Sequence, residues 1–330
     1  MNILVLGGTV FVGKHVVLQA LTAGHDVTLF NRGKSCVNAF PDLEQIHGDR
    51  DGGLGALAGR KWDAIIDTCG YVPRIVRQSV DALKDSVDRY CFVSTISVYK
   101  IESGQETVSE SDQVAILEDP NTEQITGETY GGLKVLCEHE VQAGFGERAL
   151  IVRPGLIVGP DDPTDRFSYW VNRFSQGGNC VVPAAENQPV QVVDVRDLAR
   201  WMIHAVTIGA SGTYNAAAPQ TPYMLGDMLH EIASTVGAGS RLHPISADVL
   251  EANGVGPWMD LPLYLGADEE GFAMLRANIE RAVALGFTYR SLQETVTDTL
   301  TWLASRPADQ AWKAGLKAEK EKELLATLGL

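Results

Sequence analysis

The sequence of 330 residues lacks any apolar run close to the roughly 20 residues that a membrane-spanning helix needs. Cysteine is also rare, with five residues, an odd number, and no C-x-x-C spacing. These features argue against a disulfide framework and against a structural zinc site. No basic stretch precedes the first apolar run, as it would in a secretory signal peptide. We therefore expect a cytoplasmic protein that does not associate with a membrane.

Basic residues are scarce relative to acidic ones. The chain has 27 Lys and Arg against 42 Asp and Glu, and the resulting net charge of −15 opposes the phosphate backbone of a nucleic acid. The seven histidines show no metal-ligand spacing. With 45% hydrophobic and 21% charged residues, the composition is that of an ordinary globular protein. We expect no nucleic-acid partner, no metal, and a small molecule as substrate.

Strand and helix patterns alternate through the first half of the chain. Short apolar runs typical of buried parallel strands occur at residues 2–6, 26–30, 45–47, 64–67, 90–93 and 149–152. Helix patterns lie between them at residues 11–23, 74–87 and 128–141. This alternation predicts an α/β fold, a Rossmann-like doubly wound parallel sheet with helices on both faces.

The later part of the chain divides between this sheet and a second unit. Strand and helix patterns at residues 190–193, 196–208 and 213–216 predict a return to the sheet, and helix patterns dominate from Thr221 onward. We predict a smaller, mostly helical, C-terminal substrate lobe. The assignment is a dinucleotide-binding core of residues 1–160, to which 187–216 return, and a substrate-binding lobe of 161–186 and 217–330.

Two features stand out near the C-terminus. Ser291 and Glu294 have the spacing of a capping box, in which side chain and backbone satisfy each other at a helix start. The segment 308–330 is rich in Lys and Glu and ends in several leucines. We interpret it as a solvated surface helix, and an oligomer contact is the alternative.

A glycine-rich loop joins the first predicted strand to the first helix. It reads Gly7-Gly8-Thr9-Val10-Phe11-Val12-Gly13. A dinucleotide fold needs glycines here for a tight turn and for close approach of the backbone to the ligand, and the free amides of the helix N-terminus bind a pyrophosphate. An ordinary turn is the alternative, but the position between strand and helix favours dinucleotide binding.

The end of the second strand bears on the choice of cofactor. An acidic residue there selects NAD, whereas a nearby arginine accommodates the extra phosphate of NADP. This strand ends in Phe30-Asn31-Arg32-Gly33-Lys34, which has two cations and no carboxylate. The sequence therefore favours NADP, with NAD also possible. The alternative is that Arg32 and Lys34 are solvated turn residues.

Tyr130 and Lys134 lie four positions apart on a predicted helix, so both side chains leave it on one face. An ammonium beside a phenol lowers the phenol pKa from its ordinary value of about 10, which suits acid/base catalysis. Gly131 and Gly132 leave room for a cofactor. Thr95 follows a strand at the ligand-binding edge, where its hydroxyl can bind a substrate oxygen. The alternatives are a surface Tyr–Lys pair and a threonine that bonds its own backbone.

At this point the sequence resembles the extended short-chain dehydrogenase/reductase superfamily, of the NAD(P)-dependent epimerase/dehydratase type. The similarity runs from residue 2 to about residue 305. It is carried by six motifs: Gly7-Gly8-Thr9-x-Phe11-x-Gly13, His47-Gly48-Asp49-Arg50, Val93-Ser94-Thr95-x-x-Val98-Tyr99, Tyr130-Gly131-x-x-Lys134, Arg153-Pro154-Gly155-x-x-x-Gly159-Pro160 and Val193-Asp194-Val195-x-Asp197-Leu198-Ala199.

The resemblance implies roles for several residues. Thr95, Tyr130 and Lys134 would form the catalytic triad, with Tyr130 as acid/base and Lys134 holding the nicotinamide ribose. A homodimer would form through the helices that include Tyr130. The predicted cofactor-binding positions are Gly7, Gly8, Thr9, Phe11, Val12, Gly13, Asn31, Arg32, Asp49, Arg50, Cys69, Tyr130, Lys134 and Pro154. Of these, the resemblance places Asp49 and Arg50 near the adenine.

Three departures from the superfamily pattern carry information. Val10 replaces the middle glycine of the loop, so the sequence resembles a divergent Gly-Gly-Thr-x-Phe-x-Gly branch that includes RNA-associated chloroplast relatives. Ile96 and Ser97 follow Thr95 where sugar dehydratases have Asp-Glu, which argues against a 4,6-dehydratase. Cys69 and Tyr71 are the third departure, because family members commonly have small apolar residues at this place. We expect Cys69 or Tyr71 to shape the nicotinamide side of the pocket. The alternative for Cys69 is that it only packs, as a small buried apolar residue.

The residues and the resemblance together predict an NAD(P)-dependent oxidoreductase or epimerase. Hydride transfer would occur at a carbinol or carbonyl carbon of a small hydroxylated metabolite or a nucleotide sugar. A catalytically silent, cofactor-sensing or RNA-associated scaffold on the same fold is the alternative, because fold alone does not fix function.

Overall fold

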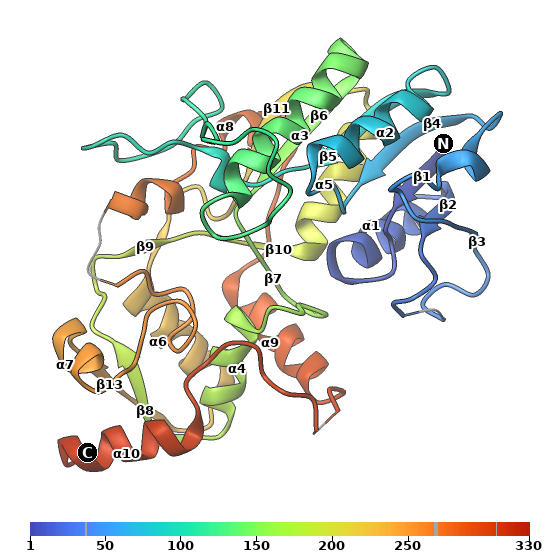
Figure 1. Cartoon of the computed structure of the whole chain (residues 1–330). Coiled ribbons are helices and arrows are strands. Elements are labelled where there is room, and N and C mark those ends of the chain that lie inside the picture. The colour runs from blue at the N-terminus through green and yellow to red at the C-terminus, as the bar shows by residue number, and fades with distance from the viewer. Residues whose placement is uncertain (37, 267–269, 308) are drawn as a thin grey trace.

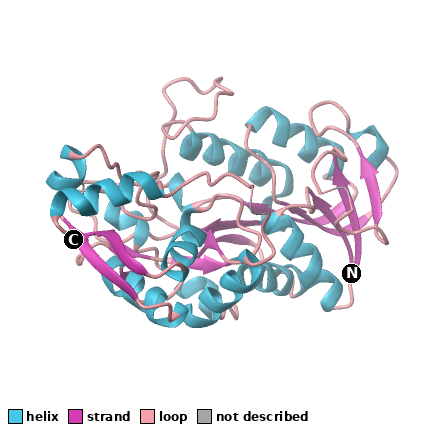
Figure 2. Cartoon of the chain, turned by 90° about the horizontal axis from the view of Figure 1, so that it is seen from below, coloured by secondary structure: helices cyan, strands magenta, loops and turns pink. Residues whose placement is uncertain are grey.

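The computed structural model describes residues 1–36, 38–266, 270–307 and 309–330. A parallel sheet of seven strands forms its larger part (Figures 1 and 2). These strands are β1 (Asn2–Leu6), β2 (Asp26–Asn31), β3 (Glu44–His47), β4 (Trp62–Asp67), β5 (Val87–Val93), β6 (Ala149–Pro154) and β11 (Gly212–Ala216). Their order in the sheet is β11-β6-β5-β4-β1-β2-β3. The chain thus winds outward in both directions from β1, and the predicted doubly wound α/β fold is confirmed.

Helices cover both faces of this sheet (Figure 1). They are α1 (Phe11–Thr22) and α5 (Val195–Thr207) on one face, and α2 (Pro73–Leu83) and α3 (Tyr130–Phe145) on the other. Within β1, Ile3 and Val5 pack under α1 and α5, whereas Leu4 and Leu6 pack under α2 and α3. Both faces are therefore apolar, which explains why the strands appear in the sequence as unbroken apolar runs. Within the described ranges, every helix is too short or too polar to cross a bilayer.

A second apolar core lies beside the sheet and includes Phe167, Trp170, Phe174, Leu229 and Val296. We call the part around it the C-terminal lobe (Figure 1). Its strands are β8 (Gly178–Pro183) and β13 (Ser240–Ile245), which pair in parallel. Its helices are α4 (Arg166–Ser175), α6 (Leu225–Val236), α7 (Ala247–Ala252), α9 (Leu292–Leu303) and α10 (Ala318–Leu328). A short helix, α8 (Glu280–Ala284), contacts β11 of the main sheet.

The strand predicted at 190–193 does not join the main sheet. It is split into β9 (Pro189–Val190), which pairs with β12 (Tyr223–Met224), and β10 (Val192–Asp194), which pairs with β7 (Leu156–Val158). Gln191 separates the two strands and is fully buried. Its side-chain amide forms hydrogen bonds with the backbone of Pro219 and Ala277, which satisfies its polar atoms away from water. From the predicted returning segment, α5 packs on the main sheet and β11 joins it. The proposed domain boundaries remain a prediction.

The end of the chain packs against the C-terminal lobe rather than being fully solvated. In α10, Glu321 and Leu324 are buried. Glu321 accepts hydrogen bonds from Arg173 at 2.6 Å and from the backbone amide of Val181 at 2.9 Å. This buried ion pair corrects the expectation of a fully solvated surface helix. A Lys/Glu-rich composition does not show which of its carboxylates faces inward, and here Glu321 does. The predicted capping box of Ser291 and Glu294 is present at the start of α9.

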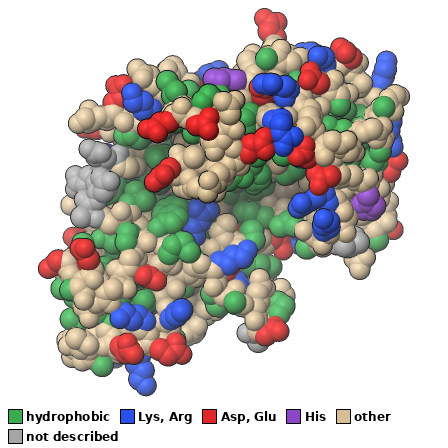
Figure 3. Space-filling view, viewed as in Figure 1, with side chains coloured by type: hydrophobic (Ala, Val, Ile, Leu, Met, Phe, Trp, Pro, Cys, Tyr) green, Lys and Arg blue, Asp and Glu red, His purple; other side chains and the backbone are tan. Residues whose placement is uncertain are grey.

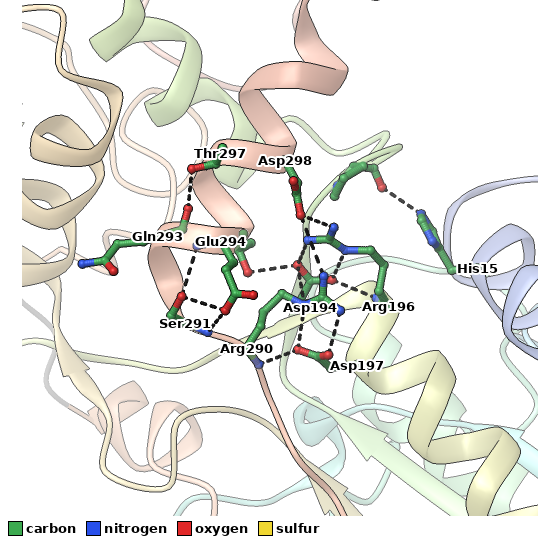
Figure 4. A network of polar contacts seen from close by, with 12 residues as sticks. His15, Asp194, Arg196, Asp197, Arg290, Ser291, Gln293, Glu294, Thr297 and Asp298 are labelled. Atoms are coloured by element: carbon green, nitrogen blue, oxygen red, sulfur yellow. Dashed lines mark hydrogen bonds and ion pairs between the residues drawn. The ribbon is translucent and has the colours of Figure 1, made fainter.

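An ion-pair network joins the main sheet to the C-terminal lobe (Figure 4). Asp194 caps α5 and binds Arg196, which also reaches Asp298 on α9. Arg290 binds the fully buried Asp197 at 2.9 Å. Because these side chains come from α5 and from the segment that leads into α9, the network fixes the lobe beside the sheet.

Candidate active site

A cleft of about 980 Å³ runs between the sheet and the C-terminal lobe (Figure 3). Figure 3 shows hydrophobic side chains over much of its floor and basic side chains within it. The glycine loop and the ends of β2, β5 and β6 line the sheet side. The start of α4 and parts of residues 258–275 line the lobe side. The cleft therefore opens at the carboxyl ends of the parallel strands, where such sheets bind ligands.

The glycine loop has the backbone that its sequence predicts. Gly7 and Gly8 have φ values of +102° and +91°, which side chains other than hydrogen rarely allow. A Cβ on Gly13 would lie 2.6 Å from the backbone nitrogen of Gly8, so α1 approaches the loop closely. No side chain caps the N-terminus of α1. Its first amides therefore face the cleft as donors for an anion.

The end of β2 lines the same cleft. The Asn31 side chain accepts the amide of Gly33 at 2.8 Å, so it shapes the turn. Arg32 and Lys34 are exposed, line the cleft and form no ion pair with any described residue. Asp49 also lines the cleft and is exposed. This end of the cleft thus offers two unneutralised cations.

Arg50 lines the cleft but its guanidinium is already bound. It forms an ion pair with the fully buried Asp67 at 2.8 Å and donates to Ser79 at 3.0 Å. Tyr90 also donates to Asp67 at 2.8 Å. Burial works to raise the pKa of Asp67, but Arg50 and Tyr90 hold it below its ordinary value. Sequence reasoning placed Arg50 near an adenine and missed this ion pair, for which the only signal was a carboxylate at the end of a buried strand.

The Cys69 thiol lies at the edge of this cluster and lines the cleft. It accepts a long contact of 3.5 Å from Arg50. Burial raises the thiol pKa, which keeps the sulfur protonated and a poor nucleophile. These properties match the reading of Cys69 as a small packing residue that shapes the wall. Pro154, at the end of β6, lines the cleft as well.

Tyr130 and Thr95 both line the cleft. Tyr130 is the first residue of α3, and Thr95 caps the short helix Ile96–Val98 at the end of β5. Burial raises the pKa of Tyr130, while the Thr95 hydroxyl and the charge of Arg166 act in the opposite direction. The pKa lowering expected from Lys134 is therefore not found. Burial outweighs the two lowering influences, and Lys134 is not among the groups that act on the phenol.

Lys134 is buried and does not line the cleft. Its ammonium donates to the carbonyl oxygens of Gly70 at 2.7 Å and Val93 at 2.6 Å. It also lies 4.2 Å from the ring centre of Phe92 and 5.2 Å from that of Tyr71. Burial lowers its pKa to about 8. Lys134 thus holds together the chain segments that follow β4 and end β5.

The two glycines after Tyr130 serve protein packing. A Cβ on Gly131 would lie 2.1 Å from the carbonyl oxygen of Ser97, and one on Gly132 would lie 2.5 Å from the side chain of Leu117. Both positions face other parts of the chain. The expectation that they make room for a cofactor is corrected, because the space beside them is filled by protein.

Sequence reasoning also missed a buried polar network behind the cleft. Glu138, one turn after Lys134 on α3, binds Arg153 at 2.7 Å and accepts a hydrogen bond from Ser94. Arg153 in turn contacts the Tyr99 hydroxyl at 3.1 Å. The network joins α3 to the end of β5 beside Thr95. No local sequence pattern signals it, because its members come from α3 and from two different strand ends.

Comparisons with known proteins agree with this architecture. A family model described as "NAD dependent epimerase/dehydratase family" matches residues 3–217. The chain is 28% identical over 221 residues to the chloroplast stem-loop binding protein of 41 kDa b of Arabidopsis thaliana, covering 62% of this chain and 55% of that protein. It is 29% identical over 188 residues to a 3-beta-hydroxysteroid dehydrogenase of Mycolicibacterium neoaurum, covering 49% of each. The chain spans about half the length of the curated relatives it matches.

Solved structures share the fold over most of the chain. UDP-N-acetylglucosamine 4-epimerase from Bacillus cereus has a TM-score of 0.68 at 16% identity, covering 94% of this chain and 99% of that one. The Bordetella bronchiseptica enzyme WbmH in complex with NAD+ has a TM-score of 0.70 at 17% identity, covering 92% and 98%. At these identities the likeness concerns the fold alone.

Proposed function

Because the chain belongs to the NAD dependent epimerase/dehydratase family, we propose that it is an NADP-dependent oxidoreductase or epimerase acting on a hydroxylated small molecule. The observation that carries the proposal is one cleft lined by the glycine loop at one end and by Tyr130 and Thr95 at the other. A dinucleotide bound at the loop would extend toward this phenol.

The residues at the cleft fit such a cofactor. The uncapped N-terminus of α1 and the positive-φ glycines offer amides to a pyrophosphate. Arg32 and Lys34 offer charge to a 2′-phosphate, and no carboxylate ends β2 to bind a free ribose hydroxyl. These features support NADP over NAD.

The chemistry divides between cofactor and protein. A bound nicotinamide would supply the hydride acceptor for a carbinol carbon or the hydride donor for a carbonyl carbon. The Tyr130 phenolate would take the hydroxyl proton in the first direction, and the Tyr130 phenol would give a proton to the carbonyl oxygen in the second, while Thr95 would hold the reacting oxygen by hydrogen bonding. Lys134 uses two of its three ammonium protons on the carbonyls of Gly70 and Val93. Its third proton would be the donor to the nicotinamide ribose, and this contact requires the cleft wall to open to Lys134, because the side chain is buried and does not line the cleft.

Replacing Arg32 with alanine tests the cofactor assignment. We expect NADP affinity to fall roughly tenfold, because a charge-assisted hydrogen bond is lost, while NAD affinity stays the same. Calorimetric titration of both nucleotides measures the effect. Arg241→Ala is the matched control, since Arg241 is exposed and lies outside the cleft. Equal losses for NADP and NAD would contradict the phosphate contact.

The lowered pKa of Lys134 gives a pH dependence. The ammonium loses its proton as the pH rises through about 8, so the donor proposed for the ribose disappears. We expect NADP affinity to fall several-fold across this range, measured by calorimetry at a series of pH values. Lys134→Met should remove the step and bind NADP weakly at every pH. An affinity that stays flat from about pH 7 to 9 with Lys134 present would argue against this role.

One observation favours a second function, an RNA-associated or cofactor-sensing scaffold. A curated relative is called a stem-loop binding protein. The net charge of −15 opposes RNA binding, and the cleft retains a phenol and a hydroxyl suited to proton transfer. A scaffold would bind NADP without turnover, so nicotinamide absorbance monitored against a panel of hydroxylated metabolites separates the two functions.

A further inference from the structure

The residues that line the cleft from the segment before Tyr130 and from the lobe side are largely apolar. Among the described residues they include Ile125, Leu156, Trp258, Leu265 and Met274. Of the four basic residues that line the whole cleft, Arg32, Lys34 and Arg50 lie with the glycine-loop end. Arg166, at the start of α4, is the single basic residue among the described lining residues of the lobe side. An apolar surface with one cation suits a ligand with one anionic group.

The Arg166 guanidinium is held in place without being neutralised. Its Nε donates to the Thr164 hydroxyl at 3.2 Å, and its plane lies over the Trp258 ring at 5.3 Å. Among the described residues no carboxylate lies within ion-pair distance of it. By contrast Arg50, in the same cleft, is bound by Asp67. Both terminal nitrogens of Arg166 therefore remain available, and two parallel donors match a carboxylate.

Asp162, four positions before Arg166, acts on this charge from a distance but does not pair with it. Asp162 is buried, and its Oδ1 accepts both the amide and the hydroxyl of Thr164 at 2.8 and 2.7 Å. It forms no ion pair with Arg166. The same threonine thus binds the carboxyl on one side and the guanidinium on the other, which keeps the two groups apart. Arg166 is left facing the cleft, with its charge felt at Tyr130.

The backbone that carries Arg166 is fixed from outside the cleft. Asp165, the residue before it, has a φ of +64° and is buried. Its carboxylate accepts bonds from Arg306 and from the backbone amide of Lys313. The segment that follows α9 therefore holds the start of α4. An anion that binds Arg166 meets a side chain already positioned, so little ordering entropy opposes binding.

We propose that Arg166 is the binding residue for a carboxylate of the substrate, and that the substrate is a hydroxy or oxo acid with an apolar body. The inference rests on the proposed function, because it takes Tyr130 as the reacting end. The carboxylate would bind the guanidinium in bidentate geometry, the apolar body would contact Trp258 and its neighbours, and the carbinol would lie at Tyr130 and Thr95. The diphosphate of a nucleoside diphosphate fits this end less well, because a single guanidinium would have to neutralise two phosphate groups.

The test compares ligands that differ only in charge. Cyclohexanecarboxylate, its neutral amide and cyclohexyl phosphate are titrated by calorimetry into the full-length protein, with and without NADP. We expect the carboxylate to bind roughly 10- to 100-fold more tightly than the amide. Arg166→Gln should abolish this preference, and Arg166→Lys should keep part of it because charge remains without the fork. Arg241→Gln, an exposed arginine of the lobe outside the cleft, should change nothing.

Three outcomes would overturn the inference. These are no measurable binding of the carboxylate, a preference that survives Arg166→Gln, and tighter binding of the phosphate ester than of the carboxylate. Failure of the proposed function has a different signature. In that case NADP does not bind, while the preference for carboxylate over amide in the protein without NADP still depends on Arg166.

Discussion

Replacing Tyr130 with phenylalanine is expected to lower kcat by roughly 10²- to 10⁴-fold, with NADP affinity nearly unchanged. The substitution removes one oxygen atom and keeps the ring, so the packing at the start of α3 is preserved. What is lost is the group that exchanges a proton with the reacting oxygen. Turnover is followed by nicotinamide absorbance with a substrate found in the metabolite panel, and affinity is followed by calorimetry.

The cleft supplies its own control for this experiment. Tyr71 also lines the cleft, and its ring centre lies 6.5 Å from that of Tyr130. Burial raises the pKa of Tyr71 to about 12, and unlike Tyr130 it has neither the Thr95 hydroxyl nor Arg166 acting against that rise. Tyr71→Phe should therefore keep most of the activity. Full activity of Tyr130→Phe, or loss of activity in Tyr71→Phe alone, would remove Tyr130 from the proposed chemistry.

Replacing Asp67 with alanine is expected to lower the free energy of unfolding by about 3–5 kcal/mol. The change leaves the Arg50 guanidinium largely buried without its counterion and deprives the Tyr90 hydroxyl of its acceptor. An uncompensated buried charge costs more than the ion pair itself contributes. Chemical denaturation followed by circular dichroism measures the loss.

A double variant separates the ion pair from the packing around it. Asp67→Asn combined with Arg50→Met removes both charges and should recover most of the stability lost in Asp67→Ala. The measurement is again chemical denaturation, with the slope of the transition compared between variants. A double variant as unstable as Asp67→Ala would mean that shape, rather than charge, dominates at this position.

The fold was predictable because its signals are local. Strands buried on both faces give unbroken apolar runs, and the loop at Gly7 and Gly8 combines a strand, positive-φ positions and a helix start within a few residues. The capping box of α9 is equally local. Each of these features depends on neighbours in sequence, so the printed sequence contains the whole signal.

The misjudged features depend on contacts between distant segments. The ion pair between Arg50 and Asp67 joins residues 17 positions apart and was missed, while the assignment of Arg50 to the cofactor stays a prediction. Glu321 was treated as a solvated residue, but Arg173 lies 148 positions away along the chain and beside it in space. Gln191 looks like part of one strand until its buried partners are known. Composition and periodicity do not report such pairings.

Other assignments are still predictions. A homodimer through α3, the helix that includes Tyr130, is one of them, and Glu140 on this helix forms an ion pair with Arg77. The roles of Thr95, Tyr130 and Lys134 depend on the experiments above. So does the preference for NADP, and the cytoplasmic location also stays a prediction.

Val10 makes the loop look unusual beside the common pattern, but its backbone and its exposure do not require glycine at this position. Its backbone is extended, with φ −133° and ψ 141°, and its side chain is 43% exposed. Any amino acid adopts such a conformation, whereas Gly7, Gly8 and Gly13 are constrained by dihedral angle or by contact. The backbone at the middle position of the loop therefore accepts residues other than glycine. A sequence search that gives equal weight to all three glycines of the common pattern will score distant relatives of this chain too low.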